Sequence, residues 1–246
     1  MRKMIVASSS AVIGSPYLEY IRPVLAEHFK NVKELCFIPY ARPSGISYDV
    51  YTNVASKAFK KIGIRVIGLH EFENPSAAIL KSEAIFTGGG NTFELVRQLY
   101  QNELFTALKK AINLGVPYLG TSAGSTICGL NMKNTNDMPV VEPPSYQTLG
   151  CFNFNLNTHY FNPEDRMGIT DGSKQDKVLK KHMLKGRDTK IKEFHHFNDT
   201  PVLGLREGSW LEVLGERVTL RGEFTARLFR KDQNPLELQS EQEIVV

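Results

Sequence analysis

The stretch Val116-Pro117-Tyr118-Leu119-Gly120-Thr121-Ser122-Ala123-Gly124 joins a short apolar run to a turn built from small residues. The run is typical of a buried β-strand, and Gly120-x-Ser122-x-Gly124 matches the nucleophile elbow, a strained bend between a strand and a helix. Small flanking residues let the chain turn without clashes, and the N-terminus of the following helix favours developing negative charge. The stretch therefore predicts a nucleophilic Ser122. The alternative is a tight structural turn with a capping serine.

Strand and helix patterns alternate on the N-terminal side of this stretch. We expect strands at 3–8, 34–39, 64–69, 83–87 and 116–120, and helices at 17–29, 48–62, from 92 onward and at 103–114. Such alternation is typical of βαβ units, whose strands form a mostly parallel sheet covered by helices on both faces. Functional groups gather at the carboxyl ends of strands in these sheets, and the glycine-marked turns 88–91 and 120–124 both occur there.

The pattern is looser beyond residue 130. Residues 133–147 are expected to form a long loop, and 175–184 have helical spacing. Four short strands, at 201–205, 209–214, 216–220 and 225–229, are expected to form antiparallel hairpins. We expect one α/β domain over residues 1–246, of which the polar segment 235–246 is partly flexible, because no repeat or low-complexity linker divides the chain.

The turn Gly88-Gly89-Gly90-Asn91 is a candidate oxyanion hole. Acyl transfer needs backbone N–H groups aimed at the oxyanion, and consecutive glycines leave these groups sterically open. One N–H from Gly89 or Gly90, with that of Ala123, would make the hole. A phosphate-binding loop ranks lower because neither GxGxxG nor Gly-Lys-Ser/Thr is present. A purely structural turn is the third reading.

A nucleophilic serine requires a base and an acid that orients the base. His159 follows a strand pattern and precedes a proline-marked loop, which makes it the best placed histidine. His28 and His182 lie in helix patterns expected to be solvated, His70 follows a strand, and His195-His196 are expected at the surface. Asp137 and Glu207 both lie at turns, and spacing alone does not choose between them as the acid.

Composition excludes several other classes of function. The net charge is +4, with 30 basic and 26 acidic residues well mixed, so a nucleic-acid partner is not expected. No apolar run approaches the roughly 18 residues that span a membrane, and the N-terminus resembles a first strand more than a signal peptide. Three separated cysteines without metal-ligand spacing predict a reducing cytoplasm and no metal site.

Five segments together resemble the peptidase E family, the aspartyl dipeptidases of the S51 serine peptidases. The segments cover nearly the whole chain in the family's order: Gly88-Gly89-Gly90-Asn91-Thr92-Phe93, Ser122-Ala123-Gly124, Thr135-Asn136-Asp137-Met138-Pro139, Asn157-Thr158-His159-Tyr160 and Gly204-Leu205-Arg206-Glu207-Gly208-Ser209-Trp210.

The resemblance implies a flavodoxin-like, class I glutamine amidotransferase-like three-layer sandwich. It implies Ser122 as nucleophile, His159 as base, Glu207 as the favoured acid and Asp137 as a residue that shapes the site. The implied activity is release of an N-terminal aspartate from a small peptide (Asp-X) in the cytoplasm, by a monomer or homodimer that needs no cofactor.

The residue that would bind the substrate's side-chain carboxylate is the least clear part of the resemblance. Family members carry an arginine-containing Thr-Arg-Glu-type segment after the histidine. Lys174 would take that place here, whereas another alignment puts Asp171 there, and Arg166 is the alternative cation. Asn91 is a further candidate for substrate binding. Three rival functions follow: a cyanophycinase-like hydrolase, a general acyl hydrolase, or a binding module with a degenerate site.

Overall fold

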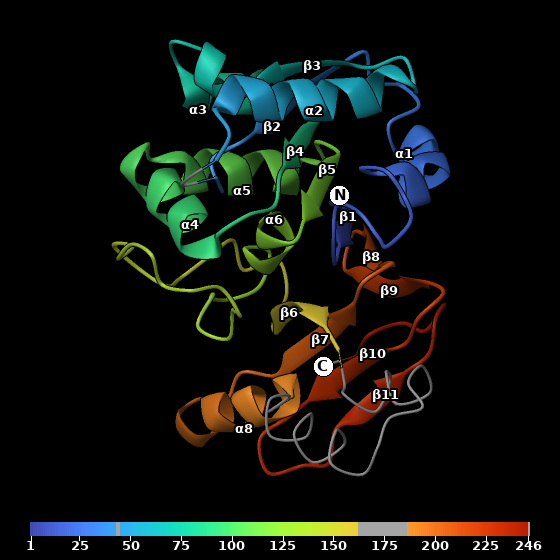
Figure 1. The fold of residues 1–246 in the computed structure, drawn as a ribbon, viewed down its shortest axis with the longest axis vertical. Coiled ribbons are helices and arrows are strands. Elements are labelled where there is room, and N and C mark those ends of the chain that lie inside the picture. Colours follow the sequence, from blue (N-terminus) through green and yellow to red (C-terminus); the bar gives the residue numbers. More distant parts are fainter. Residues whose placement is uncertain (43–44, 162–185, 246) are drawn as a thin grey trace.

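Seven strands form the main sheet of the computed structural model, which describes residues 1–42, 45–161 and 186–245 (Figure 1). The strand order is β3-β2-β4-β5-β1-β8-β9. The parallel part comprises β1 (Lys3–Ala7), β2 (Glu34–Ile38), β3 (Arg65–Gly68), β4 (Ile85–Thr87) and β5 (Tyr118–Thr121). The hairpin β8 (Ser209–Leu214) and β9 (Arg217–Gly222) extends the sheet, with β8 antiparallel to β1.

Helices cover both faces of this sheet and produce a three-layer sandwich. Side chains alternate along β1: Met4 and Val6 belong to one apolar cluster, and Ile5 and Ala7 belong to the other. The first cluster includes α3 (Pro75–Lys81), α4 (Thr92–Gln101) and α5 (Leu104–Leu114), and the second includes α1 (Arg22–His28) and α2 (Tyr48–Lys60). The predicted α/β class, with a mostly parallel sheet between two helix layers, is confirmed.

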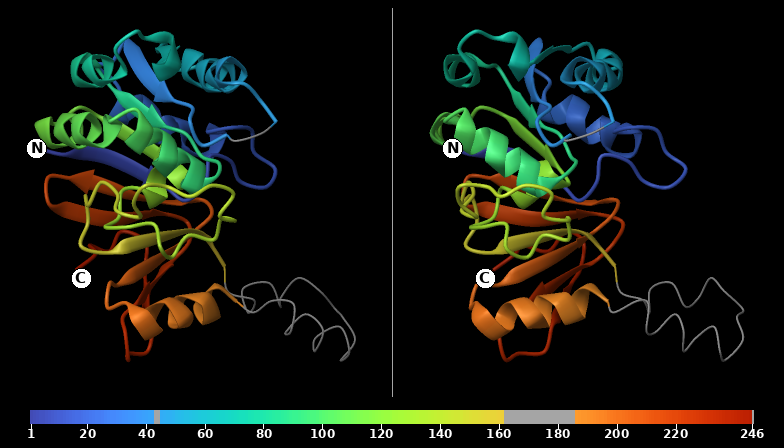
Figure 2. Two further views of the ribbon diagram at one scale, coloured as in Figure 1. Left: turned by 90° about the vertical axis from the view of Figure 1, so that its left-hand side faces the viewer. Right: turned by 60° about the vertical axis from the view of Figure 1, so that its left-hand side comes forward.

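A second sheet lies beside the first and has the strand order β11-β10-β7-β6. Its strands are β6 (Asn155–Tyr160), β7 (Val202–Arg206), β10 (Ala226–Phe229) and β11 (Leu236–Leu238). Strands β6 and β7 are parallel, and the other pairs are antiparallel. Helix α8 (Arg187–Phe197) packs Ile191 and Phe194 onto this sheet, and Figure 2 shows the helix lying along it.

Several elements differ from the sequence expectation. The helix expected at 17–29 is divided into a 3-10 turn, η1 (Glu19–Ile21), and α1, because Pro23 favours the first turn of a new helix. Helices α3 and α8 were not predicted. Within 235–246, expected as a partly flexible tail, residues 236–238 pair with β10 and Ile244 is buried. The helix expected at 175–184 lies outside the described residues.

Candidate active site

Ser122 occupies the bend at the carboxyl end of β5. Its φ of 53° and ψ of −113° are unfavourable for a residue with a side chain, and such backbone strain is concentrated at functional sites. The next residues, Ala123–Thr126, form the short helix α6. The Ser122 N–H donates to the Ala7 carbonyl of β1 at 3.2 Å, so the bend is tied to the neighbouring strand. The predicted strand–serine–helix arrangement is present.

Glycine is required at two positions around this bend because atoms of the neighbouring segment come too close for a side chain. A Cβ on Gly124 would lie 2.1 Å from the carbonyl oxygen of Thr87, and a Cβ on Gly89 would lie 2.8 Å from the Ser122 Cβ. The turn after β4 and the bend after β5 are therefore in direct contact. This contact brings the glycine-rich turn beside the candidate nucleophile.

A chain of two hydrogen bonds links Ser122, His159 and Glu207. His159 Nε2 lies 2.8 Å from Ser122 Oγ, and His159 Nδ1 lies 2.7 Å from Glu207 Oε1. An ionised carboxylate only accepts hydrogen bonds, so Nδ1 carries the proton and Nε2 is free to accept from the serine hydroxyl. The side chains of His159 and Glu207 are 39% and 47% exposed, which leaves this edge of the site open to solvent.

Three backbone N–H groups close to Ser122 are the candidates for an oxyanion hole. In the described part of the chain, Gly88 and Asn91 donate to Ile38 and Ala41, whereas Gly89 and Gly90 have no backbone acceptor. Ala123 begins α6, where an N–H has no partner within the helix. Because α6 has only four residues, its contribution is this open N–H rather than a large helix dipole.

Asp137 and Asn91 hold the adjacent loop on the N-terminus of α4. Asp137 Oδ2 accepts from the N–H and the hydroxyl of Thr92 at 2.7 and 2.5 Å. Asn91 Oδ1 accepts from the Glu94 N–H at 3.1 Å, and Asn91 Nδ2 donates to the Met138 carbonyl at 2.8 Å. Of the two carboxylates left open by the sequence, Glu207 is the one that reaches His159.

Arg187 is a cation of this site that sequence reasoning missed. Its Nε is buried without a hydrogen-bond partner among the described residues, and its guanidinium lies 5.3 Å from the centre of the Phe161 ring. Burial lowers the pKa of Arg187, and the nearby carboxylates of Asp137 and Glu207 oppose that shift. Arg187 therefore lies within electrostatic range of both carboxylates. The signal in the sequence that could have identified it is Gly186-Arg187-Asp188. Here an arginine begins a helix that lies between the segment of His159 and the segment of Glu207.

The other predicted substrate-binding residues, Arg166 and Lys174, lie outside the described residues, as do Asp171 and His182. Two histidine expectations were wrong. His28, expected to be solvated, is 8% exposed, and burial together with the charge of Lys3 lowers its pKa to about 3. His195, expected at the surface, is buried, and its Nε2 lies 3.0 Å from the Thr200 carbonyl.

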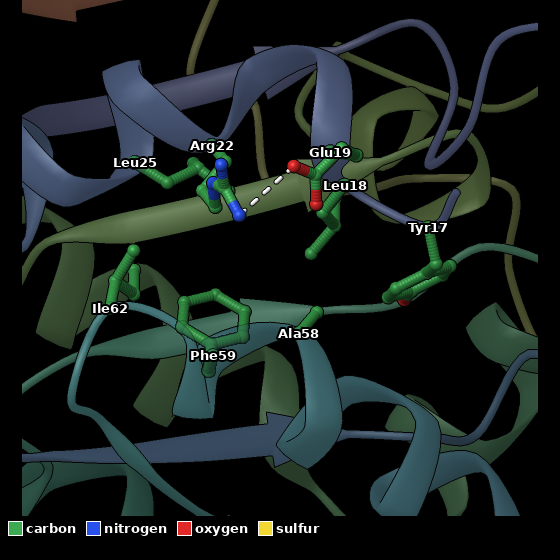
Figure 3. A pocket seen from close by; sticks show the side chains of 8 residues that line it. All are labelled: Tyr17, Leu18, Glu19, Arg22, Leu25, Ala58, Phe59 and Ile62. Carbon is green, nitrogen blue, oxygen red and sulfur yellow. Dashed lines mark ion pairs between the residues drawn. The ribbon is translucent and has the colours of Figure 1, made fainter. Parts of the chain in front are cut away.

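Neither a metal centre nor a membrane-spanning helix is found among the described residues. Among the described residues, no three His, Cys, Asp or Glu side chains are arranged to hold a metal ion, and no helix is long and apolar enough to cross a membrane. A cavity between the start of α1 and the end of α2 has a volume of about 10 Å³, room for about one water (Figure 3). Its lining includes Leu25 and Phe59 and none of the predicted site residues.

A strained strand-end serine, a histidine within hydrogen-bond distance of it and a carboxylate behind that histidine define a serine hydrolase on an α/β fold. The sequence model of peptidase family S51 matches residues 4–221. The chain belongs to peptidase family S51, and it is a serine peptidase.

Relatives agree with this assignment, and a solved structure agrees with the fold. Peptidase E of Streptomyces coelicolor is 41% identical over 235 residues, which are 96% of this chain and 90% of that protein. A probable alpha-aspartyl dipeptidase of Drosophila melanogaster is 39% identical over 240 residues, 96% and 93% of the two chains. A peptidase from an acI-B1 Actinobacterium has a similar fold, with a TM-score of 0.66, 16% identity and coverage of 100% of this chain and 97% of that one.

Proposed function

We propose that this protein is a dipeptidase that hydrolyses the bond after an N-terminal aspartate through an acyl-enzyme on Ser122. The observation that carries the proposal is the hydrogen-bonded series Ser122–His159–Glu207, with distances of 2.8 and 2.7 Å. The Asp-X specificity is supported by two relatives, named Peptidase E and probable alpha-aspartyl dipeptidase, which are 41% and 39% identical over nearly the whole chain.

Ser122, His159 and Glu207 have separate roles in the proposed reaction. His159 Nε2 takes the hydroxyl proton of Ser122 as the oxygen attacks the scissile carbonyl, and the resulting imidazolium is stabilised by Glu207. The same Nε2 then gives that proton to the leaving amine. A water, deprotonated by His159, attacks the acyl-enzyme and releases aspartate, which regenerates the Ser122 hydroxyl.

Backbone N–H groups stabilise the tetrahedral intermediate. The donors we assign are Ala123, directly after the nucleophile, and Gly89 or Gly90 from the turn in contact with Ser122. They lie in the turn after β4 and at the start of α6, and donors already in place before the reaction need little reorganisation when the negative charge develops. Each such donor contributes about 2.7–4 kcal/mol to lowering the barrier in comparable sites.

Arg187 is the residue we assign to the substrate's side-chain carboxylate. Its Nε is buried with no hydrogen-bond partner among the described residues, which is costly unless a ligand supplies the acceptor. A guanidinium binds a carboxylate through two parallel hydrogen bonds, a geometry that lysine does not offer. Burial lowers the pKa of Arg187 and the nearby carboxylates of Asp137 and Glu207 oppose that shift, while an arginine side chain stays charged in proteins. Arg166 and Lys174 become secondary candidates.

The test is hydrolysis of Asp-Leu, Glu-Leu, Ala-Leu, a simple ester and an aspartyl polymer by the wild-type protein and by Ser122→Ala. We expect Asp-Leu to be cleaved best and Ser122→Ala to retain only residual activity. Preference for the ester or Ala-Leu would support a general acyl hydrolase, and cleavage of aspartyl polymer in place of Asp-Leu would support a cyanophycinase-like enzyme. Failure of all substrates, with no labelling of Ser122 by a fluorophosphonate, would favour a binding module.

The proposal places the enzyme in the cytoplasm. Cys36, Cys128 and Cys151 are buried free thiols, and disulfides are rare in reducing compartments. Fractionation of cells that express the chain, with activity measured in the soluble and membrane fractions, tests this assignment.

A further inference from the structure

His159 is held in an unusual backbone conformation within β6. Its φ is 53°, in the left-handed region that residues with side chains rarely occupy. The pairing of β6 with β7 shifts at this point: from Asn157 to Tyr160 β6 advances three residues, while β7 advances two, from Gly204 to Arg206. One extra residue is therefore accommodated on the β6 side, and the ladder is interrupted at His159.

The hydroxyl of Ser8 fills this interruption. Ser8 Oγ accepts a hydrogen bond from the His159 N–H at 2.9 Å and donates one to the Leu205 carbonyl at 2.7 Å. One hydroxyl can be donor and acceptor together, so it satisfies one polar group on each of the two strands. The Ser8 side chain is completely buried, which leaves no solvent to replace it.

Ser8 is itself fixed next to β1, the strand that is hydrogen-bonded to the backbone of the nucleophile. It directly follows β1, and its N–H donates to the Ser209 carbonyl at 3.0 Å. The preceding residue, Ala7, accepts from the Ser122 N–H at 3.2 Å and from the Ser125 hydroxyl at 2.6 Å. Ala7, the last residue of β1, and Ser8, directly after it, thus tie the main sheet, with Ser122, to the second sheet, with His159.

We propose that Ser8 is a positioning residue, whose hydroxyl keeps His159 in the left-handed conformation that lets one imidazole reach Ser122 and Glu207. Without the hydroxyl, the His159 N–H and the Leu205 carbonyl are left without a hydrogen-bond partner, or they move toward each other. Such a movement would shift the His159 imidazole away from Ser122 and Glu207. This inference rests on the proposed role of His159 as the base. The opposing interpretation is that Ser8 only satisfies buried polar groups and contributes to stability.

The test compares Ser8→Ala with Ser209→Ala, a matched control. Ser209 is also completely buried, and its hydroxyl donates to the Phe224 carbonyl at 3.0 Å without touching the triad. We expect both variants to lose thermal stability to a similar degree. Only Ser8→Ala is expected to lower kcat for Asp-Leu, by about 10- to 100-fold at little-changed KM, because a base misplaced by about 1 Å impairs proton transfer more than substrate binding.

Two further measurements separate positioning from stability and from the dipeptidase proposal. The low-field NMR resonance of the His159 Nδ1 proton, bonded to Glu207, requires no substrate and should broaden or move upfield in Ser8→Ala but not in Ser209→Ala. Ser8→Thr, which keeps the hydroxyl, should restore that resonance and most of kcat, and it provides the readout if Ser8→Ala does not fold.

An unchanged resonance in Ser8→Ala together with a kcat within about twofold of that of Ser209→Ala would overturn the inference. If the wild type does not cleave Asp-Leu, the dipeptidase proposal fails, and the resonance alone decides the role of Ser8.

Discussion

Glu207 reaches His159 from the turn that connects the two sheets: its Oε1 lies 2.7 Å from His159 Nδ1, and the turn joins β7 of the second sheet to β8 of the main sheet. The histidine itself lies on β6 of the second sheet, whereas Ser122 ends β5 of the main sheet. The spacing of the triad is therefore set by how the two sheets meet. Contacts at that junction matter to catalysis even where they touch no substrate.

Replacing Glu207 by glutamine should impair catalysis without removing the side chain. A neutral amide no longer favours the imidazolium and can hold His159 in the wrong tautomer, a change that costs about 10⁴-fold in kcat where the acid is buried. Because the Glu207 side chain is 47% exposed, water replaces part of its effect. We expect kcat for Asp-Leu to fall by about 10²-fold or more, measured in steady-state kinetics.

Asp137→Asn is the matched comparison for Glu207→Gln. The asparagine can still accept hydrogen bonds from Thr92, so the loop should stay on α4. We expect a smaller loss of kcat, below about 10-fold, since removing this charge alters the field at the site and breaks no contact with His159. A larger loss in Asp137→Asn than in Glu207→Gln would assign the orienting role to Asp137 instead.

Removing the Arg187 guanidinium should change substrate selection. We expect Arg187→Ala to lower kcat/KM for Asp-Leu by about 10- to 100-fold, the value of one or two hydrogen bonds to a charged group. Hydrolysis of Ala-Leu, which has no side-chain carboxylate, should change little. Arg187→Lys should recover only part of the loss, because an ammonium lacks the planar fork.

Lys190→Ala is the control for Arg187→Ala, since it removes an exposed positive charge from the same helix. Its kinetics with both dipeptides should match the wild type. Equal losses for Asp-Leu and Ala-Leu in Arg187→Ala would show a general effect on the site, and specificity would then have to come from another cation.

Gly89→Ala should damage the oxyanion hole. The new Cβ would lie 2.8 Å from the Ser122 Cβ and 3.4 Å from its Oγ, so the turn after β4 or the serine must move. Loss of one oxyanion donor costs about 10²–10³ in kcat, and we expect a loss of that order with circular dichroism like that of the wild type. Retention of full activity would show that this turn does not contribute to the hole.

The regular half of the fold could be predicted because its signals are local. Alternating strand and helix patterns with glycine at the turns indicate a parallel sheet, and the strand-to-serine stretch 116–124 places Ser122 at its carboxyl edge. The contact of Gly89 with Ser122 then follows from β4 and β5 being neighbours in the sheet. These relationships depend on residues close in sequence or on a general rule of sheet topology.

The second sheet could not be predicted in the same way. Short strands from 155 to 238 have similar patterns, and nothing local assigns β7 to one sheet and β8 to the other. The choice between Asp137 and Glu207 depended on that division, because Glu207 reaches His159 from the turn between the sheets, whereas Asp137 is bonded to Thr92. Arg187 was missed for a related reason: an arginine at a helix start resembles a solvated residue until the packing of α8 is known.

His28 should make the stability of the protein depend on pH. It is 8% exposed, and burial, aided by the charge of Lys3, lowers its pKa from an ordinary 6.5 to about 3. Between these two pKa values the folded protein holds a neutral imidazole while the unfolded chain binds a proton. The contribution of neutral His28 to the unfolding free energy is therefore complete above pH 6.5 and is lost as the pH falls toward 3. Within that window this residue should lower the unfolding free energy by about 1.4 kcal/mol for each unit by which the pH falls.

Urea unfolding of His28→Phe at several pH values should give a shallower dependence of the unfolding free energy on pH. His196→Gln, at an exposed histidine, should keep the wild-type slope. Identical slopes for wild type and His28→Phe would mean that His28 becomes protonated without cost in the folded state.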